Sequence, residues 1–193
     1  MYLLTETASP FALERWAAFF ANFGQFAKGF FYTLGISIGA LIVALLLGLI
    51  FGAMSSTHNK VLRGISRVYV EIFQNTPLLV QFVVVFYGIS ILTDGHVMIP
   101  ISLTALLCVG VYTGAYISEI IRTGIEAVPK GQTEAALSQG FTYADTMRII
   151  ILPQAVRTIL PPLTNQVVNL IKNTSTVAII SGADIMFTAK AWA

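Results

Sequence analysis

Charged residues are scarce in this chain. Of its 193 residues, 10% are Asp, Glu, Lys or Arg, whereas a typical soluble domain has about 25%. The hydrophobic share is 56% and the mean hydropathy is +0.80. This composition argues against a soluble domain and predicts an integral membrane protein.

Cysteine and histidine are almost absent. The chain has one cysteine, Cys108, and two histidines, His58 and His96. A single cysteine excludes a disulfide within the chain and a site built from several thiolates, so we expect Cys108 to be a small apolar residue inside a span. The histidines fall on opposite sides of the predicted membrane, and the sequence shows no nucleophile paired with a base. An enzyme is therefore not expected.

Long apolar runs are abundant. A helix needs about 20 apolar residues to cross a hydrocarbon core of about 30 Å, and the predicted spans are 29–55, 70–93, 98–121 and 157–180. Glycines four residues apart predict close helix packing; they are Gly35 and Gly39, Gly48 and Gly52, and Gly110 and Gly114. Pro77, near the start of the second span, predicts a first turn or a kink. The predicted fold class is all-α integral membrane.

The basic residues predict an orientation. Cationic residues concentrate on cytoplasmic loops. Here they fall between the first two spans and after the third, while the turn 94–100 has no Lys or Arg. We therefore predict an external N-terminus and a cytoplasmic segment 123–156. Basic residues do not cluster with aromatic residues, so nucleic acid is not an expected partner.

Residues 1–28 form the predicted external N-terminal segment. No basic region and cleavage site precede the first span at signal-peptide distance, so we expect that span to be retained. Within the segment, Glu14 and Arg15 alternate with aromatic side chains, which suits a short helix in the membrane interface. An ordinary soluble lead-in is the alternative.

A polar stretch, EAALSQGFTYADTMRIIILPQA, occupies residues 134–155. Before it, Pro129 fits the first turn of a short helix. Gly140 stands where a helix end needs a left-handed residue, and Thr142 is a plausible N-cap, with Asp145 in a capping-box arrangement. We expect a second helix from there to Pro153.

Two short helices joined by a glycine turn are too small to form a domain with its own hydrophobic core. The segment therefore predicts a surface that binds another protein.

These motifs resemble those of a known family. One motif is similar to the EAA loop of ABC importer permeases. It consists of Glu134-Ala135-Ala136, three residues, Gly140, nine residues, Ile150, one residue and then Leu152-Pro153. Residues 75–81, 114–122, 160–165 and 172–175 look like the corresponding stretches of the polar amino acid uptake branch, which includes histidine-, glutamine-, glutamate- and arginine-type importers. The resemblance covers the chain from about residue 30 to its end.

The resemblance implies the type I ABC importer transmembrane fold for residues 29–193. It also implies a multi-pass permease in the inner or plasma membrane. Its partners would be a dimer of ATPase subunits, a second permease subunit, an extracytoplasmic substrate-binding protein, membrane lipid and the amino acid. The residues expected to couple it to the ATPase are Glu134, Ala135, Ala136, Gly140 and Pro153.

No cofactor is expected in this chain. The sequence has no G-x-x-x-x-G-K-S/T motif, and its loops are too short to hold an ATPase domain. ATP and Mg would therefore be bound by the partner ATPase. The family pattern has five spans, whereas the sequence reaches Ala193 without a fifth. We expect a truncated sequence, and a protein of four spans is the alternative.

Polar residues gather in the fourth apolar region. The candidate substrate path consists of Asn165, Asn169, Lys172, Asn173, Thr174 and Ser175. At helical spacing, Asn165, Asn169 and Lys172 or Asn173 share a face, which suits a water-filled path or hydrogen bonds between helices. The resembled family often has an acidic residue where Asn173 stands. Its absence beside Lys172 favours glutamine or glutamate over a cationic amino acid.

Four ionisable residues lie at the edges of the second and third spans: Arg67, Glu71, Glu119 and Arg122. We expect them to anchor the spans or to form salt bridges between subunits. Glu119 and Arg122 are three residues apart and can meet on one helix face.

The sequence raises three functional hypotheses. The leading one is the permease subunit of an ATP-driven importer of polar amino acids. A stand-alone channel or secondary transporter for small polar solutes would predict carboxylates within the membrane, and the predicted spans have none away from their ends. A membrane scaffold would leave the polar face of the fourth region unexplained.

Overall fold

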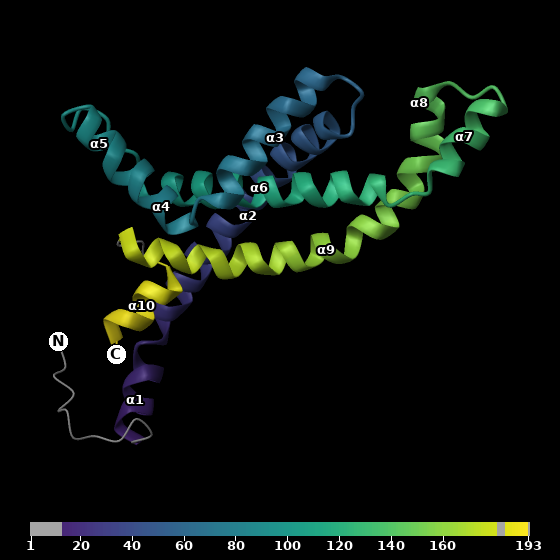
Figure 1. Ribbon diagram of the computed structural model, residues 1–193. Coiled ribbons are helices and arrows are strands. Elements are labelled where there is room, and N and C mark those ends of the chain that lie inside the picture. Colours follow the sequence, from purple (N-terminus) through teal and green to yellow (C-terminus); the bar gives the residue numbers. More distant parts are fainter. Residues whose placement is uncertain (1–12, 181–183, 193) are drawn as a thin grey trace.

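The computed structural model describes residues 13–180 and 184–192, and every regular element within these ranges is a helix (Figure 1). In chain order they are α1 (Leu13–Ala21), α2 (Phe23–Ser55), α3 (Lys60–Asn75), α4 (Leu78–Val83), the π-helical turn η1 (Val84–Gly88), α5 (Ile89–Leu92), α6 (Ile101–Glu126), α7 (Lys130–Ser138), α8 (Tyr143–Asp145), the π-helical turn η2 (Thr146–Ile151), α9 (Leu152–Asn173), the 3₁₀ helix η3 (Thr174–Ile180) and α10 (Ile185–Trp192). Residues 1–12 of the expected external segment lie outside the described residues.

The helices form an elongated arrangement around α6. Helices α6 and α9 run side by side, α2 crosses and packs against α6, and α3 lies over both α2 and α6 (Figure 1). The pair α7 and α8 forms a tip at one end of the molecule, whereas α1 and α10 lie at the other end. The buried core lies mainly where α2 meets α6.

Small residues let α2 and α6 approach closely. Ala40 and Ala44 are fully buried. A Cβ atom placed on Gly110 would lie 2.9 Å from Val43 Cβ and 3.1 Å from the Ala40 carbonyl oxygen. The predicted close packing is confirmed at this contact. A Cβ atom on Gly35 would meet nothing within 4 Å in this chain, so close packing at Gly35 stays a prediction.

Two of the described helices, α2 and α6, are long and apolar enough to cross a membrane, and α3 together with α4–α5 adds a third if that bent pair counts as one span. The helix α9 does not reach the same apolarity within the described residues, since amides, Arg157 and Lys172 interrupt it. The predicted span 157–180 therefore stays a prediction.

The expected span 70–93 is not one straight helix. Helix α3 and the segment 78–92 meet at an angle of 97°, and the break falls at Thr76 and Pro77, whose ψ angles are 123° and 133°. The side-chain amide of Gln81 donates hydrogen bonds to the carbonyl oxygens of Phe73 (3.2 Å) and Thr76 (3.0 Å). It thereby satisfies carbonyls at the end of α3 that no helical N–H reaches. The kink predicted at Pro77 is confirmed.

The helix expected to end at Pro153 continues as α9 as far as Asn173, so that prediction is wrong. Pro153 occupies the first turn of α9, directly after the π-helical turn η2. A proline is tolerated in a first turn, where its missing N–H costs little.

Candidate functional site

The turn between α7 and α8 has the geometry that its residues predict. Gly140 has a φ of +86°. The Gly140 N–H donates to the Leu137 carbonyl (3.1 Å) and the Phe141 N–H donates to the Ala136 carbonyl (3.2 Å). This pair of bonds is a Schellman motif, which closes a helix through a left-handed residue. The left-handed helix end predicted at Gly140 is confirmed.

The start of α8 is capped as predicted. The Asp145 N–H donates to Thr142 Oγ1 (3.2 Å), and the Thr142 hydroxyl donates to the Asp145 carboxylate (2.6 Å). The Asp145 carboxylate therefore accepts a hydrogen bond from the Thr142 hydroxyl. In a standard capping box it would instead accept one from the backbone N–H of the N-cap residue. Both bonds fix the direction in which the chain leaves the glycine turn.

The tip is held to the rest of the molecule by its own apolar contacts. Val128, Ile151 and Ala155 are buried together. Ile125 of α6 and Ile159 of α9 pack around them. This small core holds η2 and the segment between α6 and α7 against the ends of α6 and α9.

Four of the five residues expected to couple to an ATPase are exposed: Glu134, Ala135 and Gly140 at the tip, and Pro153 in the first turn of α9. The fifth, Ala136, is buried, and its carbonyl accepts the Schellman bond. Glu134 lies beside a cavity of about 730 Å³ between α7, η2 and the ends of α2 and α6. The tip therefore offers a partner an exposed surface that combines polar side chains with the apolar side chains of Leu137, Phe141 and Tyr143.

The candidate path on α9 divides into two groups. Asn165, Asn169 and Lys172 are exposed on one face, and none of their side chains makes a hydrogen bond or ion pair within residues 13–180 and 184–192. They point away from the face of α9 that buries Gln166 and Leu170.

The remaining path residues lie where α9 ends and η3 begins. Asn173 is half-buried and Thr174 is buried. Their neighbour Ser175 is exposed, and its Oγ donates to the Lys172 carbonyl (2.8 Å). Thr174 Oγ1 likewise donates to the Ile171 carbonyl (2.6 Å). The hydroxyls thus bond to the local backbone, and the role of all six residues in a substrate path stays a prediction.

Sequence reasoning missed a polar cavity of about 510 Å³ between α3 and α6. Its lining comes from the end of α2, one face of α3 and the last turns of α6: Ser55, Arg63, Ser66, Arg67, Val70, Glu71, Gln74, Ser118, Glu119, Arg122 and Glu126. Polar residues recurring every three or four positions along α3 were a signal for such a face. The sequence could not show that α6 lies opposite.

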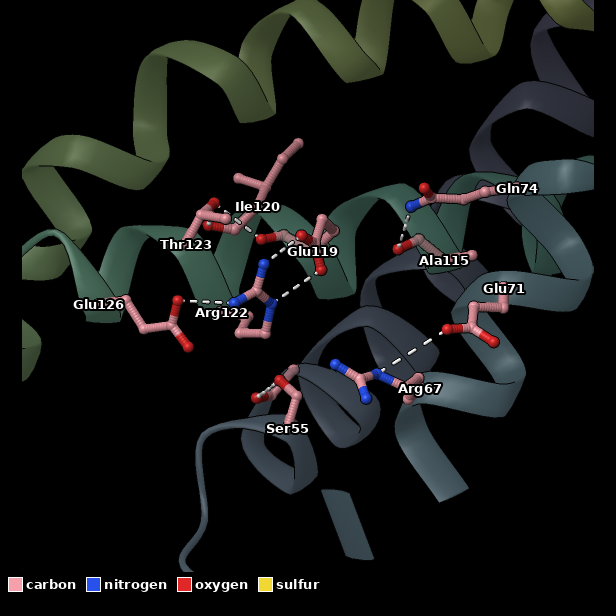
Figure 2. Close-up of polar contacts among 11 residues, drawn as sticks. Ser55, Arg67, Glu71, Gln74, Ala115, Glu119, Ile120, Arg122, Thr123 and Glu126 are labelled. Atoms are coloured by element: carbon pink, nitrogen blue, oxygen red, sulfur yellow. Dashed lines mark hydrogen bonds and ion pairs between the residues drawn. The ribbon is translucent and has the colours of Figure 1, made fainter. Parts of the chain in front are cut away.

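Ion pairs line both walls of this cavity (Figure 2). Arg122 Nε donates to Glu119 (2.9 Å) and a second Arg122 nitrogen also bonds Glu119, while Nη1 donates to Glu126 (2.6 Å). Arg67 Nε lies 3.8 Å from Glu71, and both side chains are largely exposed. The predicted meeting of Glu119 and Arg122 is confirmed, and each of these pairs lies within one helix.

No metal site is visible in the described part of the chain. No three His, Cys, Asp or Glu side chains come together there as ligands. Cys108, expected as a small apolar residue inside a span, is a free and buried thiol in α6.

Comparison with known proteins places these features in context. Residues 44–192 match the family described as binding-protein-dependent transport system inner membrane component. The chain is 41% identical to a probable glutamine ABC transporter permease protein of Bacillus subtilis, over 88% of this chain and 77% of that protein. It is 35% identical to a glutamate/aspartate import permease protein of Escherichia coli, over 88% of this chain and 76% of that protein.

A solved structure is also similar. It is described as the crystal structure of an amino acid ABC transporter with histidines, and it matches with a TM-score of 0.83 and 33% sequence identity. The match covers 91% of this chain and 80% of that chain. The helices described above are therefore arranged as in a solved amino acid transporter.

Proposed function

This chain belongs to the family of binding-protein-dependent transport system inner membrane components, and from that premise we propose that it imports glutamine or glutamate, powered by a separate ATPase that binds the α7–α8 tip. The all-α fold expected of a type I ABC importer permease is confirmed by the similar solved structure. The chain is a membrane permease of an amino acid ABC importer. The finer statements about substrate, partners and orientation are the proposal.

The observation that carries the coupling proposal is the rigid, exposed tip. The Schellman motif at Gly140 and the capping bonds at Thr142 hold two short helices in a fixed relation. Glu134 and Ala135 point outward from it. Pre-organised surfaces bind without paying the full entropy of ordering a loop. We take this tip as the cytoplasmic surface that receives the ATPase, which would bind ATP and Mg.

The remaining partners follow from the same proposal. A second permease subunit would complete the membrane part, and an extracytoplasmic binding protein would deliver the amino acid on the side opposite the tip. The N-terminus would lie outside and the protein would be a multi-pass component of the inner or plasma membrane, as the distribution of Lys and Arg predicts.

The substrate proposal is supported by two kinds of observation. The relatives named above are called glutamine and glutamate/aspartate permeases. In this chain, Lys172 contributes a positive charge to the polar face of α9, and Asn173 supplies no carboxylate beside it. A cationic side chain entering this region would meet like charge without a partner.

Competition experiments test the substrate. Uptake of labelled glutamine by cells that express the complete transporter is measured against unlabelled amino acids. We expect glutamine and glutamate to compete best. In Asn173→Asp, a new carboxylate should improve competition by arginine roughly tenfold, which corresponds to about 1.4 kcal/mol of pairing. Asn165→Asp, which places a carboxylate two turns earlier on the same helix, should change competition by arginine less. Arginine or lysine competing best against the unaltered protein would contradict the proposal.

A further inference from the structure

Helix α3 turns its polar face towards the protein. Arg63, Arg67, Glu71 and Gln74 line the cavity shared with α6. The opposite side of α3 is apolar and exposed, and its members are Val61, Ile65, Val68 and Ile72. A helix of a water-soluble protein shows the reverse pattern. This arrangement suits a helix with water on its inner side and an apolar medium on its outer side.

The two walls of the cavity carry opposite net charge. On α3, Arg63 and Arg67 outnumber the carboxylate of Glu71 by one. On α6, Glu119 and Glu126 outnumber the guanidinium of Arg122 by one. Figure 2 shows Arg67 and Glu71 on α3, and Glu119, Arg122 and Glu126 on α6, facing the same space from their separate helices. A solute that carries one charge of each sign would find a complementary group on each wall.

Some of these groups have bonding capacity to spare. Arg122 is occupied by two carboxylates, whereas Arg63 makes no ion pair with any described residue. Arg67 is only loosely paired, at 3.8 Å. Ser118 lines the same cavity and is 1% exposed, and its Oγ has no hydrogen-bond partner among the described residues. A buried hydroxyl without a partner costs free energy, which a polar ligand or water in the cavity would relieve.

We propose that the cavity between α3 and α6 is the inner exit chamber of the transporter, which receives the amino acid as a zwitterion. The α-carboxylate lies towards Arg63 and Arg67, and the α-ammonium lies towards Glu119 and Glu126. The volume of about 510 Å³ is within the range of about 300–1,000 Å³ found for small-molecule sites. A lipid headgroup is the less favoured occupant. The apolar face of α3, which suits contact with lipid, lies on the side of the helix opposite the cavity.

The inference rests on the proposed import function and is tested with the complete transporter in vesicles. The binding protein and labelled glutamine are outside, and unlabelled compounds are loaded inside. Internal glutamine should occupy the chamber and slow uptake. Glutaramate lacks the α-ammonium and 4-aminobutanamide lacks the α-carboxylate. Each should inhibit at least about tenfold more weakly, which corresponds to losing one charge-assisted contact.

The double variant Arg63→Gln, Arg67→Gln should raise the half-inhibiting concentration of internal glutamine by about tenfold or more. The external half-saturating concentration should change much less, because the proposed chamber lies on the inner side, away from the face at which the binding protein delivers glutamine. Lys60→Gln is the matched control: it removes a cation from the same helix but lies outside the cavity, and it should behave as the unaltered protein does. If the double variant does not assemble, Ser118→Ala removes only a hydroxyl and should raise the half-inhibiting concentration about threefold.

Three results would overturn the chamber. The first is that the double variant and Ser118→Ala both take up glutamine and are inhibited by internal glutamine as strongly as the unaltered protein. That result rejects the chamber but not the import function. The second is equal inhibition by glutamine and the two analogues. The third is an uptake defect in the double variant that follows the share of anionic lipid in the vesicles, which would assign the cavity to a lipid headgroup. An unaltered complex that takes up no amino acid would instead reject the import function itself.

Discussion

At Gly140 a single backbone angle determines where the exposed tip points. Its φ of +86° lies in the left-handed region, which costs other residues about 1–2 kcal/mol and β-branched residues more. The two Schellman bonds depend on that angle. Nothing lies within 4 Å of a Cβ atom built on Gly140, so the constraint comes from the backbone and not from crowding.

Replacing Gly140 by valine should therefore disturb the tip while the spans still insert. We expect ATPase association and amino acid uptake to fall about tenfold, as a cost of 1–2 kcal/mol implies. Gly131→Val is the control, since Gly131 lies in α7, has equally open surroundings and shows no positive φ. Copurification of the ATPase and uptake are the measurements. Normal uptake in Gly140→Val would refute the role given to this turn.

At the scale of the elements, local rules predicted the tip well. Proline at a first turn, glycine at a helix end and threonine at an N-cap each act within a few residues. The positions Gly140 and Thr142 were therefore readable from the sequence. The kink at Pro77 was also readable, because proline lacks an N–H and restricts its neighbours.

Features without a clear signal in their own residues could not be predicted. The 97° bend after α3 is completed by Gln81, whose side chain reaches back to Phe73 and Thr76. The continuation of α9 beyond Pro153 depends on η2, and a π-helical turn has no clear sequence signal. The polar cavity could be predicted only by knowing that α3 faces the end of α6. Periodicity gives the faces of a helix but not the neighbour of each face.

At the scale of the whole molecule, the α7–α8 tip lies at the end opposite α1 and α10 (Figure 1). The turn 94–100 joins α5 to α6 and has no Lys or Arg, whereas the tip has Lys130 and the adjoining η2 has Arg148. If cationic loops stay in the cytoplasm, the tip lies inside and the turn between α5 and α6 lies outside.

Cysteine labelling tests this orientation. In a Cys108→Ala background, His96→Cys should react with a membrane-impermeant thiol reagent added to intact cells. Gly131→Cys should react only after the cells are opened. Both positions are exposed, so a difference in labelling reports the side of the membrane. Labelling of Gly131→Cys alone in intact cells would reverse the proposed orientation.

The dependence of uptake on the ATPase distinguishes an ABC permease from a channel or secondary transporter most directly. Vesicles are prepared with this permease, with and without its ATPase, and the loaded binding protein is supplied outside. We predict that labelled glutamine accumulates above its external concentration only when the ATPase and internal ATP are both present. Accumulation or equilibration of glutamine at the same rate without the ATPase would contradict an ATP-driven permease.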